Sequence, residues 1–282
     1  MAELFDSVDA AQKKVGPQAE RNAQIKSSLD KIKHKFIVMS GKGGVGKTST
    51  SVNLSVALAN QGFKVGIMDV DLHGPDVPRM LGMKGLLDLN DNKKLTPMVY
   101  SSNLGAVSIE SLTTNKDDAI IWRGPIKYSA IQQFIADVEW GELDFLVIDS
   151  PPGTGDEPLT IAQMIPDALA IVVTTPQEVS LADVRKSISF CRTVKMEIFG
   201  IIENMSGLAC PHCDELIELF GSGGGEKMAQ SLDLNFLGRI PIDPNMVKCG
   251  DAGIPHQTKY KNSPVAVAFA DIAKKIGRHS KT

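Results

Sequence analysis

The chain has 282 residues, 43% of them hydrophobic, and its 30 basic and 33 acidic residues give a net charge of −3. A chain of this composition can bury a sizeable core, which excludes global disorder. The balanced charge predicts neither nucleic acid nor a membrane surface as a partner, because no basic field is present.

Residues 1–33 are polar and charged, and they contain neither a strand pattern nor the apolar segment of a secretory signal. We expect them to form a loosely attached helical or flexible extension. No clear boundary interrupts residues 34–282, so a single domain is predicted there. No apolar run in the sequence is long enough to predict a transmembrane helix.

Short apolar runs rich in Val and Ile recur along this domain, and they are nearly continuous rather than alternating. This pattern is typical of strands that are buried on both faces of a parallel sheet. The predicted strands are Phe36–Met39, Val65–Met68, Leu104–Ile109, Phe145–Ile148, Ala168–Val173 and Ile198–Ile202.

Segments with helical spacing of apolar residues lie between these runs. The predicted helices are Ser49–Gln61, Ile126–Val138, Ser180–Val194 and Pro264–Ile276. Alternating strands and helices predict the α/β class, with a doubly wound, mostly parallel sheet and helices on both faces. The last helix is Ala-rich with Lys274 and Lys275 near its end, and we expect it to dock on the sheet.

The segment Gly41–Thr48 reads Gly-Lys-Gly-Gly-Val-Gly-Lys-Thr and lies between a predicted strand and a predicted helix. It fits G-x-x-x-x-G-K-[ST], the phosphate-binding loop of nucleotide-binding proteins, and predicts ATP as ligand. Glycines let backbone N–H groups point at the phosphates, and the helix N-terminus adds positive charge. Lys47 would neutralise phosphate charge, and the Thr48 hydroxyl would ligate Mg²⁺. The predicted nucleotide-contacting residues are Gly41, Gly43, Gly44, Val45, Gly46, Lys47, Thr48 and Ser49.

Carboxylates follow two of the predicted strands, at the edge where parallel sheets bind ligands. Asp69 is predicted to hold the Mg²⁺ shell, and Asp71 to orient the attacking water. The apolar strand that ends in Asp149 has the Walker B pattern, so Asp149 is predicted to hold Mg²⁺ directly or through water. A loop rich in Pro and Gly leads on to Asp156, which either caps the next helix or takes part in a nucleotide switch.

Cys210 and Cys213 stand at C-x-x-C spacing in a loop at about residues 206–225. One such pair supplies two metal ligands, whereas zinc and iron–sulfur sites usually take four. A symmetric dimer would complete the set from a second copy. A bridging iron–sulfur cluster, a bridging Zn²⁺, a thiol redox pair and an inert pair all remain compatible with this spacing.

The remaining cysteines, Cys191 and Cys249, are expected to pack in the interior. Four unevenly spaced cysteines do not make a disulfide framework, so we expect a reducing, cytoplasmic location. The glycine-rich run Gly221–Gly225 is expected to let the cysteine loop move with nucleotide state, or simply to be a flexible loop.

Lys42 follows the first glycine of the phosphate loop, where an ordinary P-loop needs no charge. From spacing alone it is either a solvated surface lysine or a functional one. With Lys42, the loop resembles the deviant Walker A loop of MinD, ParA and the nitrogenase reductase. That resemblance implies a lysine that reaches across a dimer to the partner's nucleotide and promotes hydrolysis, as an arginine finger does in trans.

A more specific resemblance covers roughly residues 30–276. Seven segments occur in the order seen in the Mrp family, also called ApbC: Gly41–Thr48, Asp69–Pro78, Trp122–Pro125, Asp149–Asp156, Glu203–Cys213, Gly223–Gly225 and Gly250–Pro255. The family resemblance implies a slow, Mg-dependent ATPase that bridges a [4Fe-4S] cluster between two subunits on Cys210 and Cys213. Such a carrier delivers its cluster to apo iron–sulfur proteins.

The resemblance also implies that Asn204, Pro241 and Asp243 surround the adenine. It implies a homodimer formed through the face that carries the nucleotide and the cysteines. Residues 1–33 contain no cysteine, so the N-terminal cluster of the eukaryotic relatives is not expected. Two rival functions use the same loop: a MinD- or ParA-type positioning ATPase on membrane or DNA, and an electron-donating reductase like the nitrogenase iron protein.

Overall fold

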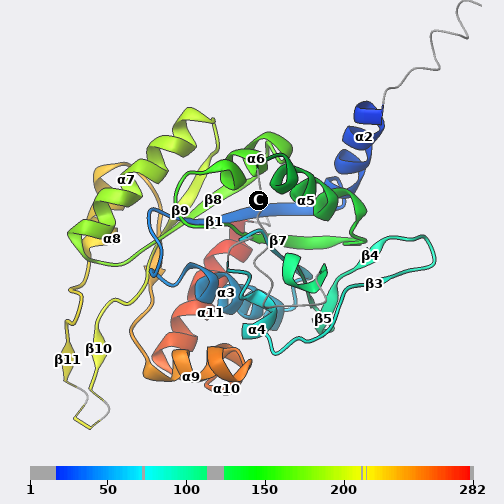
Figure 1. The fold of residues 1–282 in the computed structure, drawn as a ribbon. Coiled ribbons are helices and arrows are strands. Elements are labelled where there is room, and N and C mark those ends of the chain that lie inside the picture. Colours follow the sequence, from blue (N-terminus) through cyan, green and yellow to red (C-terminus); the bar gives the residue numbers. More distant parts are fainter. Residues whose placement is uncertain (1–16, 72–73, 113–123, 211, 214, 280–282) are drawn as a thin grey trace, which may run out of the picture.

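The computed structural model describes residues 17–71, 74–112, 124–210, 212–213 and 215–279 (Figure 1). Within these residues, eight strands form one sheet in the order β12, β9, β8, β1, β7, β2, β6, β5. Every neighbouring pair is parallel except β5 and β6. The strands are β1 Ile32–Ser40, β2 Val65–Asp69, β5 Met98–Ser101, β6 Leu104–Ser108, β7 Leu143–Asp149, β8 Leu169–Thr174, β9 Ile198–Glu203 and β12 Phe236–Arg239.

The predicted α/β class and mostly parallel sheet are confirmed, and each of the predicted strands is present with shifted ends. The largest shift is in β1, which begins at Ile32 rather than Phe36. The two edge strands, β5 and β12, were not predicted. Both are short and only partly buried, so they lack the continuous apolar run that identifies the central strands.

Helices cover both faces of the sheet (Figure 1). The longer ones are α2 Pro17–Leu29, α3 Lys47–Asn60, α5 Gly124–Asp137, α6 Asp156–Met164, α7 Glu178–Thr193, α8 Gly224–Ser231, α9 Pro244–Ala252 and α11 Pro264–His279. Phe36 and Val38 of β1 face the core with α3 and α11, whereas the alternating residues Ile37 and Met39 face the core with α2, α5 and α6. This alternation follows from the two-residue period of a strand, and it gives the doubly wound layering.

Shorter elements connect these layers. They are α4 Val77–Met80, η1 Ile109–Leu112, α10 His256–Lys259 and the paired strands β3 Asp88–Leu89 with β4 Leu95–Thr96 and β10 Leu208–Ala209 with β11 Leu216–Ile217. The β10–β11 pair projects away from the sheet (Figure 1).

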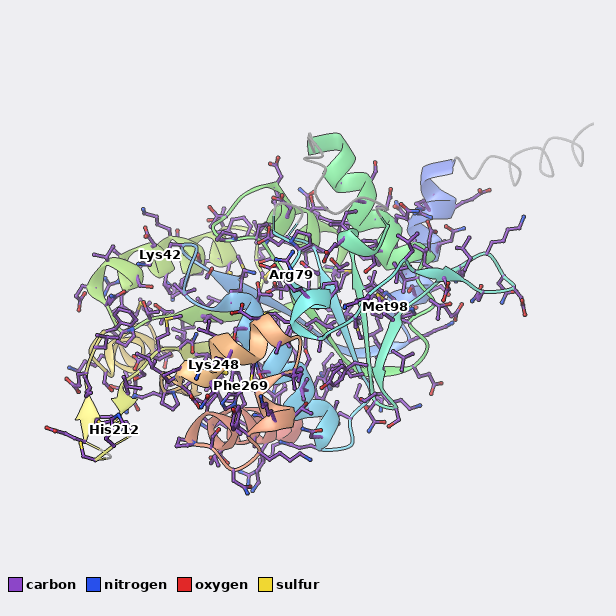
Figure 2. All side chains as sticks on the ribbon, turned by 60° about the horizontal axis from the view of Figure 1, so that its bottom comes forward. Lys42, Arg79, Met98, His212, Lys248 and Phe269 are labelled. Atoms are coloured by element: carbon purple, nitrogen blue, oxygen red, sulfur yellow. The ribbon has the colours of Figure 1, made fainter. Side chains whose placement is uncertain are left out.

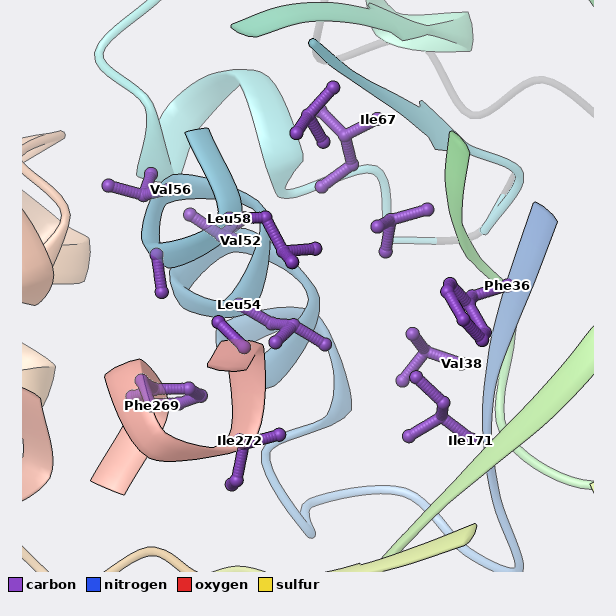
Figure 3. Packing of buried hydrophobic residues seen from close by; sticks show 14 of the residues in the cluster. Phe36, Val38, Val52, Leu54, Val56, Leu58, Ile67, Ile171, Phe269 and Ile272 are labelled. Carbon is purple, nitrogen blue, oxygen red and sulfur yellow. The ribbon is translucent and has the colours of Figure 1, made fainter. Parts of the chain in front are cut away.

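Helix α11 docks on the body, as its Ala-rich sequence predicted. Phe269 is 1% exposed and packs in the same core as Val52 and Leu54 of α3 and Phe36 of β1 (Figure 3). Burial of one such aromatic side chain contributes about 1.5–3 kcal/mol, so α11 is held by its apolar face. Among the described residues, no helix is long and apolar enough to cross a membrane.

Helix α2 corrects one expectation. Residues 17–29 are helical, but they are not loosely attached, since Ile25 and Leu29 are each 7% exposed in the core shared with α5 and α6. Arg21 also forms a two-pronged ion pair with Asp137 of α5. The expected boundary between residues 33 and 34 falls inside β1. Residues 1–16 of the extension lie outside the described residues.

Candidate nucleotide site and cysteine hairpin

The predicted site residues converge on one edge of the sheet. The phosphate loop follows β1, Asp69 ends β2, Asp149 ends β7, and Asn204 follows β9. These strands are parallel, so their carboxyl ends meet at the same edge. Asp69 and Asp149 are direct partners in the register of β2 and β7. The two carboxylates that were predicted to hold Mg²⁺ therefore lie side by side.

Glycine is required at several positions of the phosphate loop. Gly44 and Gly46 both have φ of 80°, a left-handed conformation that residues with a side chain rarely adopt. A Cβ on Gly41 would lie 2.3 Å from the carbonyl carbon of Asp183 in α7, closer than any side chain permits. Helix α3 begins at Lys47, directly after Gly46. Its N-terminus therefore faces the loop, which suits an anionic ligand.

Lys47, Thr48 and Asp149 form the centre of this loop. Lys47 is 7% exposed and its Nζ lies 2.9 Å from Oδ1 of Asp149, which is fully buried. The hydroxyl of Thr48 donates to the other oxygen, Oδ2, at 2.7 Å. Ser51 donates to Oδ1 at 2.7 Å. Asp149 is thus held by one cation and two hydroxyls at the helix start.

Asp69 sits beside this cluster, also fully buried. One of its oxygens accepts from the amide of Asp71, and the other from the amide of Val77 and the hydroxyl of Ser108. Burial, and next the neighbouring charge of Asp149, raise the pKa of Asp69 well above its ordinary value. Two adjacent buried carboxylates and a threonine hydroxyl are oxygen donors that match Mg²⁺, so the residues fit that ion.

The remaining predicted catalytic side chains lie around the loop. Asp71 is half-buried. Lys42 is half-buried on the phosphate loop between β1 and α3, where its carbonyl accepts from Ser40 (Figure 2). Among the described residues its ammonium has no ion-pair partner. Asp156 is exposed in the first turn of α6, whose N-cap is Gly155, so the expected capping role is wrong and its negative charge instead lies at a helix N-terminus.

A cavity of about 480 Å³ adjoins the phosphate loop. It brings together the predicted residues from distant parts of the chain, and its walls also include Met205, Phe220 and Met246. The predicted site residues on its lining are Gly46, Thr48, Ser49, Asn204, Pro241 and Asp243. Most of its exposed lining is apolar, which suits the flat face of a base.

Asn204 contacts the loop directly. Its side-chain amide donates to the carbonyl of Val45 at 2.8 Å, and that nitrogen lies 2.3 Å from where a Cβ on Gly46 would be. Asp243 instead caps α9 by accepting from the amide of Asn245, and its other oxygen lies 2.9 Å from Nε2 of His256. Asn204 and Asp243 therefore both line the cavity, and both side chains also contact other residues of the chain.

Two residues that were not predicted contact site residues: Ser51 donates to Asp149, and His256 pairs with Asp243. Ser51 lies four residues after Lys47 and so shares its helix face, a spacing that would have found it. His256 is separated from Asp243 by a helix and a loop, and nothing in the local sequence indicates that the two meet. Trp122 and Arg123, part of one family segment, lie outside the described residues.

The predicted cysteine loop is a projecting hairpin, which we define as residues 206–223 with β10 and β11. Cys210 is half-buried and Cys213 is exposed, and His212 lies at the end of the projection (Figure 2). Among the described residues, no group of three or more His, Cys, Asp or Glu side chains is arranged to hold a metal ion. The hairpin of one chain thus presents two thiols to its surroundings.

We predict that alkylation of the native protein separates its four thiols into two pairs. Cys191 and Cys249 are buried and therefore shielded from the reagent. Burial also raises the pKa of Cys191 to about 11 and raises that of Cys249, so both should stay protonated at pH 8. Iodoacetamide should modify Cys210 and Cys213 first, and all four only in denaturant, as read by peptide mass spectrometry. Equal rates for Cys191 and Cys213 in native protein would contradict the assignment.

The phosphate loop places this protein in the class of P-loop NTPases. The ion pair between its lysine and the Walker B aspartate, and the adjoining cavity, agree with this class. Its sequence matches the family described as "ParA: NUBPL iron-transfer P-loop NTPase" over residues 31–277. The match spans most of the chain, so the chain belongs to this family.

Relatives and solved structures agree with this membership. The chain is 48% identical to a Dictyostelium discoideum protein named cytosolic Fe-S cluster assembly factor NUBP2 homolog, covering 90% of this chain and 98% of that protein. It is 46% identical to the iron-sulfur cluster carrier protein of Saccharolobus solfataricus, covering 94% and 90%. A nucleotide-binding protein of Archaeoglobus fulgidus, solved with ADP, superposes with a TM-score of 0.75 at 38% identity, covering 86% of this chain and 94% of that one.

Proposed function

We propose that this protein is an ATP-dependent carrier that holds an iron–sulfur cluster between two copies of the chain and delivers it to apo iron–sulfur proteins. The observation that carries the proposal is the cysteine hairpin. It offers two thiols on a chain that also has a complete phosphate loop, and no third ligand accompanies them among the described residues. Two copies related by a twofold axis supply four thiolates, the number that a [4Fe-4S] cluster takes.

In this proposal the nucleotide site is a slow, Mg-dependent ATPase. Lys47 and the amides of the phosphate loop bind the phosphates, and Asn204 with the apolar cavity wall binds the base. Mg²⁺, held by Thr48 and Asp149 with Asp69 in its shell, would offset charge on the β- and γ-phosphates. Asp71 orients the attacking water, and Lys42 of the facing copy stabilises charge on the γ-phosphate in the transition state.

The relatives' names support the cargo and the compartment. The Saccharolobus solfataricus relative is named a carrier of iron–sulfur clusters, and the Dictyostelium discoideum relative is named a cytosolic assembly factor. We extend both properties to this chain and place it in the cytoplasm. The MinD-type rival is less favoured, since α11, the helix that the sequence offers as a membrane anchor, buries its apolar face against α3.

We predict that anaerobic reconstitution with iron and sulfide loads about two iron atoms per chain, as expected for one [4Fe-4S] cluster shared by two chains. The double variant Cys210→Ala/Cys213→Ala should lose the iron and the visible absorption band. The measurements are iron and sulfide analysis, visible spectra, and the mass of the loaded particle by light scattering.

A Cys249→Ala variant is the control, because it removes one thiol outside the hairpin, on helix α9, and it should load as the parent does. Iron binding by the double variant at the parent level would contradict the proposal. Zinc in place of iron, bound by the same two cysteines, would replace the cluster by a bridging metal ion.

A further inference from the structure

Glu203 is a fully buried carboxylate that the proposed chemistry does not use. It is the last residue of β9, next to Asn204 of the nucleotide cavity. A buried charge is strongly destabilising unless several donors surround it. The donors that surround Glu203 therefore show which parts of the chain it holds together.

Three of those donors come from the two ends of the cysteine hairpin and the first turn of α8, and Arg239 of β12 adds an ion pair, with its Nε 3.5 Å from Oε1. The hydroxyl of Ser206, where the hairpin begins, donates to Oε1 at 2.6 Å. The amide of Gly223, where the hairpin ends, donates to the same oxygen at 2.8 Å. The amide of Gly225 donates to Oε2 at 2.5 Å. One carboxylate thus joins the two ends of the hairpin that carries Cys210 and Cys213. We call these joined ends the root of the hairpin.

The returning end of the hairpin is shaped for this contact. Gly223 is the N-cap of α8, with φ of 82° and no side chain of its own to cap the helix. The Glu203 carboxylate takes the place of that cap and also faces the positive end of the helix. A Cβ on Gly224 would lie 2.5 Å from the carbonyl oxygen of Pro176, so this end has little room to shift.

The same root also contacts the nucleotide cavity. The carbonyl of Gly207 accepts from the amide of Ile242, which lines the cavity. Met205, just before the hairpin, and Leu219 and Phe220, near its end, line the cavity as well. The hairpin root and the nucleotide cavity therefore share a wall.

We infer that Glu203 is a positioning residue for the proposed cargo site: it fixes the root of the cysteine hairpin on the wall of the nucleotide cavity and so sets where Cys210 and Cys213 stand. The inference rests on the proposed carrier function for its consequence, which is cluster retention. Its structural content, a hairpin fixed by one carboxylate, holds whether or not a cluster binds.

The test is Glu203→Gln, which keeps the size of the side chain but removes its charge and turns one acceptor into a donor. The control is Glu226→Gln, which removes the surface partner of Arg239 and leaves Glu203 and its amide donors in place. Because Arg239 also pairs with Glu203, this control tests whether that ion pair, rather than the amide hydrogen bonds, fixes the hairpin. Hydrogen exchange of the Gly223 and Gly225 amides is measured in the metal-free 282-residue chain, and the mobility of a spin label on Cys213 is measured in the same chain with Cys210→Ala, so that the label does not attach to Cys210.

In Glu203→Gln we expect exchange of these two amides to accelerate at least about tenfold, corresponding to about 1.4 kcal/mol, and the spin label to become more mobile. Amides of β8 and α3 should exchange as in the parent, which a merely global loss of stability would not allow. Iron release from the reconstituted variant to a chelator should accelerate by a similar factor, while ADP binding persists. Glu226→Gln should match the parent.

Unchanged exchange at Gly223 and Gly225, or acceleration spread evenly over the sheet, would overturn the inference. If Glu203→Gln does not fold, Ser206→Ala replaces it, since it removes one donor to Oε1 and should loosen the label on Cys213 in the same direction. A parent chain that binds no cluster would remove the proposed function, yet the exchange and label data would still decide the role of Glu203.

Discussion

Lys47→Ala is expected to weaken ATP and ADP binding by a factor of about 30 to several thousand, because truncating a buried, charge-paired donor costs about 2–5 kcal/mol. The lysine is 7% exposed at the start of α3, so its charge is little screened by water. Isothermal titration with ADP measures the loss. ATP turnover should fall to background in the same variant.

The same substitution is also expected to destabilise the nucleotide-free protein. Lys47 pairs with Asp149, and removing one partner of a buried ion pair costs about 3–5 kcal/mol since the other charge stays behind. The double variant Lys47→Ala/Asp149→Asn separates the two effects, because it removes the stranded charge. We expect it to regain thermal stability but not ADP affinity. Recovery of both would contradict a direct role of Lys47 in phosphate binding.

The central sheet was predictable because its strands are buried on both faces. Val65–Met68 and Phe145–Ile148 are continuous apolar runs, and both lie within observed strands whose burial leaves no room for polar residues. Helix α2 was not predicted to dock. Its contacts, such as Arg21 with Asp137, join residues 116 positions apart, and a local pattern carries no signal for such a pair.

The site residues also fall into two groups: those that the sequence predicts and those that only the tertiary structure brings together. The phosphate loop and Asp149 were found because their function requires fixed residue types at fixed spacing, and the fold brings them together as that spacing implies. The pairing of Asp243 with His256 depends instead on how α9 and α10 pack. It is a property of tertiary structure.

The glycine-rich run Gly221–Gly225 illustrates a third situation. Composition indicated a flexible segment, yet Gly223 and Gly225 donate to a buried carboxylate and Gly224 opens a helix in close contact with Pro176. Glycine is needed here for a left-handed turn and for close approach, which are rigid requirements. Composition alone does not distinguish a glycine that provides freedom from one that provides space.

Lys42→Ala is expected to lower the turnover number for ATP by about a thousandfold, the scale of a charge supplied in trans to the transferred phosphoryl group, and to leave ADP affinity unchanged. Its ammonium lacks an ion-pair partner among the described residues, so the substitution breaks no ion pair there. Lys186→Ala is the control, since it removes an exposed lysine on helix α7, which contacts the phosphate loop at Gly41. The change in ATP turnover is measured as phosphate release at several protein concentrations.

A mixture of the two lysine variants tests the trans arrangement directly. A Lys42→Ala chain binds nucleotide but lacks the lysine that reaches across the dimer, whereas a Lys47→Ala chain keeps Lys42 but binds nucleotide only weakly. If Lys42 acts across a dimer, the mixed pair contains one complete site, and ATP hydrolysis should reappear although each variant alone is inactive. A mixture that forms mixed pairs, as seen by cross-linking, but stays inactive would mean that Lys42 serves the nucleotide of its own chain, and the dimer would then have to be explained by the cysteine hairpins alone.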